Sequence, residues 1–179
     1  GAVILLHGLT DSPYSLRHIG RMYRDHGFFV FAPRLPGHGT VPAGLTVAQW
    51  EDWVATTRMV MREARKQVPA PKPIHIVGFS NGGALALKQA LDAIENPDLV
   101  KPDRLILLSP MIGITGFARF AGLAGLPAFF PRFAKAAWLS IMPEFNPFKY
   151  NSFPVNGARQ SHQLTQELQG QVARLARQN

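Results

Sequence analysis

Residues 74–83, with the sequence IHIVGFSNGG, join an apolar run to a serine that stands between glycines. The segment GFSNG at 78–82 matches the pattern Gly-x-Ser-x-Gly, and a helical pattern follows at 84–94. A tight turn between a strand and a helix projects such a serine above the sheet, and the flanking glycines allow the two elements to approach closely. The stretch therefore predicts a nucleophilic serine, Ser80, at the carboxyl end of a strand.

Two phosphate-binding interpretations fit this loop poorly. A Walker loop needs Lys followed by Ser or Thr after its last glycine, but Ala84 and Leu85 stand there, and the dinucleotide pattern Gly-x-Gly-x-x-Gly is absent. A glycine-rich turn selected for packing, with an incidental serine, remains the alternative.

Four apolar runs bounded by turn residues read as buried strands: Ala2–Leu6, 28–32, Ile74–Phe79 and 104–109. Each is almost continuously apolar, which is typical of parallel strands covered on both faces. Helical patterns separate the runs, so the order strand, helix, strand predicts an α/β fold with a doubly wound, mostly parallel sheet.

The expected helices have identifiable boundaries. The first covers 12–26 and ends at Gly27, and its inner face carries Leu16, Ile19 and Tyr23. A capping box at 46–49 opens the second, whose expected inner stripe is Val47, Trp50, Val54 and Met61. The last begins near Ala158 and is expected to bury Leu164, Leu168, Val172 and Leu175.

Chemistry gathers at the carboxyl ends of the strands in such sheets. Residues 7–10, 36–39 and 78–82 follow the first three strands and are expected to meet there. An acyl-transfer serine needs two N–H donors for the oxyanion, and the backbone amides of Leu9 and Asn81 are placed to supply them. We interpret His7 and His38 as structural residues that order these loops, and His75 lies within the third strand.

The chain resembles the α/β-hydrolases, and within them the bacterial carboxylesterases and monoacylglycerol lipases. The resemblance rests on HGLTDSPYSLR, PRLPGHGT, WEDW and GFSNGG, which occur in the family's order across residues 1–110. It implies a serine esterase with Ser80 as nucleophile and the Leu9 and Asn81 amides as oxyanion donors. It also implies a hydrolase core at 1–110, a cap or lid at 111–158 and a C-terminal helix at 159–179.

Two features depart from the family's pattern. Asn81 replaces a frequent Met, which matters little where a backbone amide acts. The triad acid and base should follow the serine, but His162 is the only later histidine, and we interpret it as a surface residue. The later acidic residues have no strand-end context: Asp92, Glu95, Asp98, Asp103, Glu144 and Glu167. We therefore expect a chain truncated at both ends, inactive alone, whose catalytic Asp and His lie outside it.

The amino-acid composition excludes several kinds of functional site. The 179 residues include 19 basic and 11 acidic side chains, a formal net charge of +8, and no cysteine, which excludes disulfides, thiolate zinc sites and a cysteine nucleophile. No metal or cofactor is implied. The basic residues stand singly or at helical spacing, as in Arg17, Arg21 and Arg24, so we favour solvated helix faces over nucleic-acid binding.

The most apolar segment, residues 105–131, is long enough to cross a bilayer, but it is interrupted by Gly113, Gly116, Gly122, Gly125 and Pro127. We expect turns and short helices there and no transmembrane span. No signal peptide is visible at Gly1, so we expect a cytoplasmic protein of unknown oligomeric state.

The leading hypothesis is a serine hydrolase that cleaves acyl esters or monoacylglycerols through an acyl-enzyme on Ser80. Two alternatives stay open: a hydrolase-like module that binds a ligand without turnover, and a basic protein that binds nucleic acid or a membrane surface.

Overall fold

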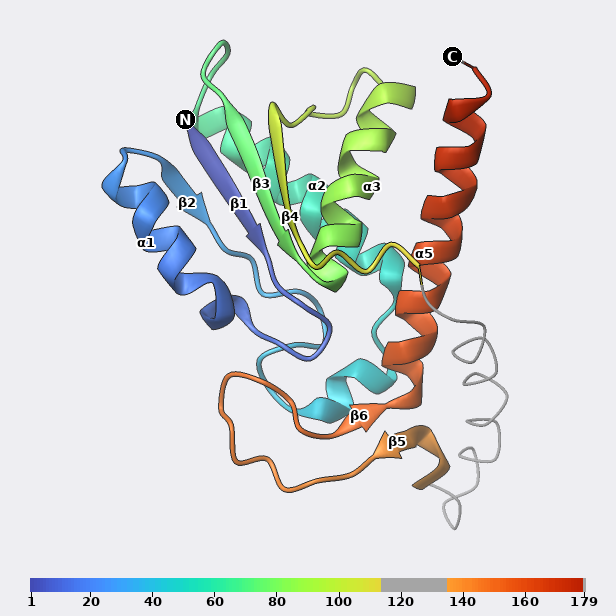
Figure 1. Ribbon diagram of the computed structural model, residues 1–179. Coiled ribbons are helices and arrows are strands. Elements are labelled where there is room, and N and C mark those ends of the chain that lie inside the picture. Colours follow the sequence, from blue (N-terminus) through green and yellow to red (C-terminus); the bar gives the residue numbers. More distant parts are fainter. Residues whose placement is uncertain (114–134, 179) are drawn as a thin grey trace.

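The computed structural model describes residues 1–113 and 135–178, and it forms an α/β fold around a parallel sheet (Figure 1). Four strands, β1 (Ala2–Leu6), β2 (Phe29–Phe31), β3 (Ile74–Phe79) and β4 (Arg104–Leu108), lie in the order β2-β1-β3-β4. All three neighbouring pairs are parallel. The strand prediction is confirmed to within a residue at each end, as is the α/β fold with its parallel sheet.

Helices cover both faces of this sheet (Figure 1). Helix α1 (Arg17–Asp25), preceded by the 3-10 turn η1 (Pro13–Leu16), covers one face, and α2 (Trp50–Gln67) with α3 (Asn81–Glu95) covers the other. The side chains of β1 alternate between the two cores: Val3 and Leu5 pack with Leu16 of η1, while the even-numbered residues join the larger core under α2 and α3. This two-sided burial explains why β1 is continuously apolar.

The outer strand β2 corrects the expectation that all four strands are buried. Phe29 is 57% exposed and Val30 is 36% exposed. Within the described residues β2 pairs only with β1, so one of its edges lacks a neighbouring strand. Its apolar composition therefore did not by itself predict its environment.

The capping prediction for the second helix was also wrong. Residues Pro42–Thr46 form a separate 3-10 turn, η2, in which the Thr46 hydroxyl donates to the Ala43 carbonyl oxygen, and α2 begins only at Trp50, four residues after Thr46. The N-cap of α2 is Gln49, whose N–H donates to the Asp52 carboxylate at 3.3 Å. Val47, expected on the inner face, is 74% exposed because it precedes the helix.

Helix α5 (Val155–Ala176) packs against α3 (Figure 1) and begins three residues earlier than expected. Leu164 and Leu168 are buried as predicted, whereas Val172 is 45% exposed and the neighbouring Gln171 is fully buried. A short antiparallel pair, β5 (Trp138–Ser140) and β6 (Phe153–Pro154), precedes α5 within the expected cap. Most of the cap's apolar segment, at 114–134, lies outside the described residues.

A buried ionic network joins α2, α3 and α5. The Asp92 carboxylate accepts hydrogen bonds from Lys88 at 2.6 Å, Arg58 at 2.7 Å and Gln171 at 3.0 Å. Burial raises the pKa of Asp92, but these three donors outweigh it and hold that pKa below its usual range. The network accounts for the burial of Lys88 and Asp92 on α3 and of Gln171 on α5.

Replacing Asp92 with asparagine should lower the free energy of unfolding by about 3 kcal/mol at pH 7, because buried Lys88 would lose its close carboxylate partner and keep only Glu167 at 3.7 Å. Since the folded pKa of Asp92 is depressed, its contribution is present at neutral pH and is lost as the pH falls through the acidic range below about 4. Urea denaturation at pH 7 and pH 3.5 measures both effects. Asp25→Asn, in an exposed pair with Arg24, is the control and should change stability by less than about 0.5 kcal/mol.

Candidate active site

Ser80 occupies the turn between β3 and α3 with a strained backbone. Its φ of 53° and ψ of −115° lie where residues other than glycine are rarely found. Its N–H donates to the Leu108 carbonyl oxygen at 3.0 Å, and its own carbonyl oxygen accepts from Gly83 and Met111, each at 2.9 Å. The end of β4 and the first turn of α3 thus hold Ser80 in this conformation.

The glycines around Ser80 permit backbone contact that no other residue allows. A Cβ atom on Gly82 would collide with the carbonyl oxygens of Leu6 and His7, and one on Gly78 would collide with the Gly82 carbonyl. The end of β1 therefore lies directly against the first turn of α3. The expected close approach of strand and helix is confirmed.

The loop after β1 carries the Leu9 amide. The Gly8 carbonyl oxygen accepts from His7 Nδ1 at 2.9 Å and from the Asp11 N–H at 3.2 Å. Because the N–H and C=O of a trans peptide point in opposite directions, these bonds orient the Leu9 N–H away from both donors. They also polarise the peptide and make that N–H a stronger donor.

Leu9 and Asn81 each present a backbone N–H without a hydrogen-bond partner among the described residues. Both residues are buried, at 6% and 0% exposed. The Asn81 N–H is one of the first amides of α3, which have no intrahelical partner, whereas an N–H without a partner on a buried residue such as Leu9 is rare in folded proteins. The Asn81 amide also lies at the N-terminus of α3, where the helix dipole favours negative charge.

His7 is fully buried and orders this loop, as predicted. Its Nδ1 bonds to the Gly8 carbonyl, and its Nε2 accepts from the Leu35 N–H at 3.2 Å. Burial, with a contribution from nearby His38, lowers the pKa of His7 to about 4. A neutral ring with both nitrogens engaged cannot also serve as a base for Ser80.

The His7 imidazole should stay neutral down to about pH 5, because its folded pKa is depressed. The neutral ring contributes fully to the free energy of unfolding above pH 6.5, which is the pKa of histidine in the unfolded chain. This contribution is lost as the pH falls toward 4, and the free energy of unfolding then drops by roughly 3 kcal/mol. An NMR titration of the His7 imidazole resonances tests this. A His7 midpoint near 6.5 would contradict the assignment.

His38 and His75 also have structural partners. The Nε2 atom of His38 lies 2.7 Å from the Leu9 carbonyl oxygen, and its Nδ1 lies 3.0 Å from that of Pro36. His75 bonds to the Tyr23 hydroxyl under α1, on the other face of the sheet. The loops after β1, β2 and β3 therefore meet at one end of the sheet, as expected.

His162 corrects the expectation of a surface residue. It is 7% exposed, and its Nδ1 atom is buried without a partner among the described residues. The preceding Ser161 hydroxyl donates to Asn81 Oδ1 at 3.0 Å, which places this turn of α5 against the residue after Ser80. Sequence reasoning missed this contact, although Ser161, Leu164, Thr165 and Leu168 share one helical face and signalled its burial.

Five of the six acidic candidates are held by structural partners. Asp92, Glu95 and Glu167 pair with cations on the helices, Asp103 accepts from the Ile74 N–H, and Glu144 accepts from the N–H groups of Asn151 and Ser152. Within residues 1–113 and 135–178 no side chain is hydrogen-bonded to the Ser80 hydroxyl. Within this part of the chain the Ser80 hydroxyl therefore has no hydrogen-bonded acid or base.

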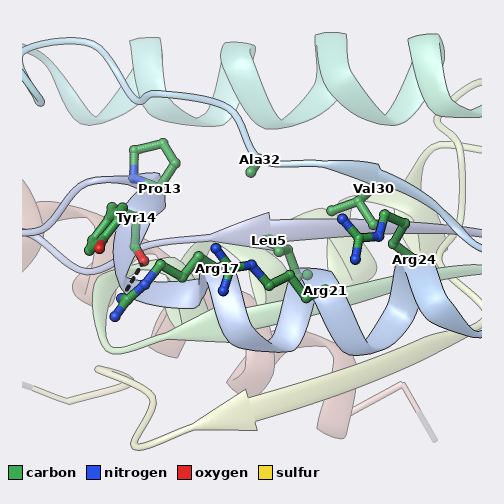
Figure 2. A pocket seen from close by; sticks show the side chains of 9 residues that line it. Leu5, Pro13, Tyr14, Arg17, Arg21, Arg24, Val30 and Ala32 are labelled. Carbon is green, nitrogen blue, oxygen red and sulfur yellow. Dashed lines mark hydrogen bonds between the residues drawn. The ribbon is translucent and has the colours of Figure 1, made fainter.

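A groove of about 450 Å³ between α1 and the sheet is separate from this site (Figure 2). Leu5, Val30 and Ala32 form its apolar part, and Arg17, Arg21 and Arg24 of α1 line its side. Arg17 bonds to the Tyr14 carbonyl oxygen and lies over the Tyr14 ring, while Arg24 pairs with Asp25. Arg21 and Arg24 are exposed, in agreement with a solvated helix face.

Neither a metal centre nor a membrane-spanning helix is present in the described part of the chain. No three His, Asp or Glu side chains there are grouped to hold a metal ion. None of its helices combines the length and apolarity needed to cross a bilayer.

The profile of the Alpha/beta hydrolase family matches residues 3–177, nearly the whole chain. The chain belongs to the alpha/beta hydrolase family. This alpha/beta hydrolase is 34% identical over 85 residues to the thermostable monoacylglycerol lipase of Bacillus sp. (strain H-257), a match that covers 48% of this chain and 33% of the relative. It is 32% identical over 87 residues to the carboxylesterase of Bacillus subtilis (strain 168), covering 49% of this chain and 35% of the relative.

Solved structures agree on the fold of this alpha/beta hydrolase. A structure from the work on LipS and LipT, two metagenome-derived lipolytic enzymes, superimposes with a TM-score of 0.69 at 21% identity, covering 95% of this chain and 66% of the other. The chain aligns with about a third of each curated relative and with just under two thirds of that structure.

Proposed function

We propose that the whole protein is a serine hydrolase that cleaves carboxylic esters through an acyl-enzyme on Ser80. The observation that carries this proposal is the pairing of a strained serine with two buried, unpartnered amides, those of Leu9 and Asn81. Preorganised donors of this kind stabilise the oxyanion of a tetrahedral intermediate, and each contributes about 10²–10³ in rate.

In this mechanism the Ser80 hydroxyl attacks the ester carbonyl carbon while a general base removes its proton. The carbonyl oxygen becomes an oxyanion that accepts hydrogen bonds from the Leu9 and Asn81 N–H groups. Collapse expels the alcohol, which takes the proton from the base, and water then hydrolyses the acyl-enzyme by the same steps. The proposal assigns the base and its acidic partner to a His–Asp pair outside the described residues.

The substrate class we propose is an acyl ester or monoacylglycerol. The two Bacillus relatives are named a monoacylglycerol lipase and a carboxylesterase, which supports ester substrates here. The segment before α5 also presents apolar side chains that suit an acyl chain: Leu139, Ile141, Met142, Phe145 and Phe148 are each at least 42% exposed. Tyr14 in η1, which follows the loop after β1, stacks on Phe148 at 3.6 Å between ring centroids and so holds that segment against η1.

One observation favours a second candidate, a hydrolase-like module that binds esters without turnover. The Ser80 hydroxyl has no hydrogen-bonded base among the described residues. Such a module would bind an acyl ester saturably but release no burst of alcohol.

The two candidates separate in an assay with p-nitrophenyl butyrate and a fluorophosphonate probe. We expect the longest available gene product to hydrolyse the ester and react with the probe, and the 179-residue chain to do neither. Turnover by the 179-residue chain would place the base within it, with buried His162 as the first candidate. Ester binding without a burst or labelling in either form would favour the binding module.

A further inference from the structure

The loop after β1, which carries the proposed oxyanion donor Leu9, is held by hydrogen bonds to its carbonyl oxygens at Gly8, Leu9 and Thr10. His7 and the Asp11 N–H bond to the Gly8 carbonyl, His38 bonds to the Leu9 carbonyl, and the Tyr150 N–H donates to the Thr10 carbonyl at 2.7 Å. Both peptide units that flank the Leu9 Cα are therefore fixed, while the Leu9 N–H is left free. Because this loop has no regular secondary structure, its position depends on these bonds.

His38 is the side chain that reaches this loop from the loop after β2. It is 2% exposed and lies edge-on to His7, with 4.9 Å between ring centroids, and edge-on to Trp53, with 5.8 Å. The chain on either side of His38 is tied to Tyr150, whose hydroxyl donates to the Gly37 carbonyl and accepts from the Thr40 N–H, each at 3.0 Å. The ring has little freedom to move away from Leu9.

The hydrogen-bond network assigns the His38 proton to Nε2. Burial lowers the pKa of His38 against the opposing effect of the Pro36, Leu9 and Leu35 backbone and of Asp11, and the lowered pKa favours the neutral ring. A neutral imidazole donates through one nitrogen only. The Pro36 carbonyl near Nδ1 already accepts from Trp53 Nε1 at 3.0 Å, whereas the Leu9 carbonyl has no other donor in the described residues. The Nε2 contact is also the shorter, at 2.7 Å against 3.0 Å.

We propose that His38 is a positioning residue for ester hydrolysis, which donates from Nε2 to the Leu9 carbonyl and so holds the Leu9 N–H in place for the oxyanion. This inference rests on the proposed function. An oxyanion donor must be held to about 0.5 Å, and a displacement of about 1 Å can lower the rate about 10²-fold. His38 itself touches neither the substrate nor the reacting atoms.

Two conservative variants of the whole protein test which of the two ring nitrogens of His38 is needed. His38→Gln places an amide N–H near the Nε2 position and keeps the bond to Leu9, whereas His38→Asn reproduces only Nδ1. We expect His38→Asn to lower kcat about 10- to 100-fold with KM changed less than about twofold, and His38→Gln to stay within about threefold of wild type.

Binding of a trifluoromethyl ketone, which forms an oxyanion on the serine, should weaken in proportion to the loss in kcat. A purely structural role would instead lower stability equally in both variants and leave kcat per folded molecule unchanged. Either that result or full activity of His38→Asn would overturn the positioning role of His38. The proposed function would still be supported in both cases if the wild-type protein hydrolyses the ester. A wild-type protein that neither hydrolyses the ester nor reacts with the fluorophosphonate probe would overturn both the proposed function and the role of His38.

The proton assignment can be tested without any substitution. The ¹⁵N shifts of the His38 ring in wild-type protein should report a protonated Nε2 and a bare Nδ1. The opposite tautomer would overturn the inference even if His38→Asn failed to fold.

Discussion

Replacing Ser80 with alanine in the whole protein should abolish ester hydrolysis, with kcat reduced about 10⁴-fold or more and folding retained. Without the hydroxyl no acyl-enzyme forms, and the amides of Leu9 and Asn81 can stabilise only an uncatalysed attack by water. Because alanine removes one oxygen atom and keeps the Cβ, the backbone strain at φ 53° is unchanged. Steady-state kinetics with p-nitrophenyl butyrate measures the effect.

Ser109→Ala is the matched control. Ser109 is the other residue besides glycine with a positive φ in the described chain, at 44°, and it directly follows β4. The same atom is removed from a similarly strained backbone close to the site, so this variant should retain hydrolysis within about threefold. Full activity in Ser80→Ala would refute the nucleophile assignment, and equal loss in both variants would attribute the effect to the backbone.

Replacing Gly82 with alanine should destabilise the protein by about 3 kcal/mol or more, enough to unfold much of it. The added Cβ would overlap the carbonyl oxygens of Leu6 and His7. These are backbone atoms at the end of a buried strand, which cannot rotate away as a flexible side chain could. Urea denaturation followed by circular dichroism measures the loss.

Gly170→Ala tests whether the steric contact is responsible. Gly170 lies within α5, and a Cβ there would meet no atom within 4 Å. Since alanine is the better helix former, this variant should be more stable by about 0.5–1 kcal/mol. Wild-type stability in Gly82→Ala would contradict the close approach of β1 and α3 on which the site's geometry depends.

The elements that the sequence predicted well are those with a local physical cause. The continuous apolar runs of β1 and β3 reflect their central place in the sheet, and Gly27 ends the first helix region with a φ of 79°. The turn at Ser80 was predictable because its glycines are required by steric contacts with residues nearby in the sequence and with the adjoining strand.

The features that the sequence missed depend on contacts between distant segments. Burial of His162 follows from the contact between Ser161 and Asn81, 80 residues apart, and the loop around Leu9 is held in part by Tyr150, which lies within the expected cap. The capping error at Thr46 arose because Thr46 ends the separate turn η2, and the capping box of α2 is formed by Gln49 with Asp52. The roles of Ser80, Leu9 and Asn81 stay predictions.

Mass-spectrometric mapping of the fluorophosphonate adduct tests the central proposal most directly. The whole protein is labelled, digested and searched for the modified residue, with heat-denatured protein as the control for nonspecific reaction. We predict a single adduct on Ser80, formed only by folded protein and suppressed by an ester substrate. An adduct on another residue, or none on a folded protein that hydrolyses esters, would contradict the assignment of Ser80 as the nucleophile.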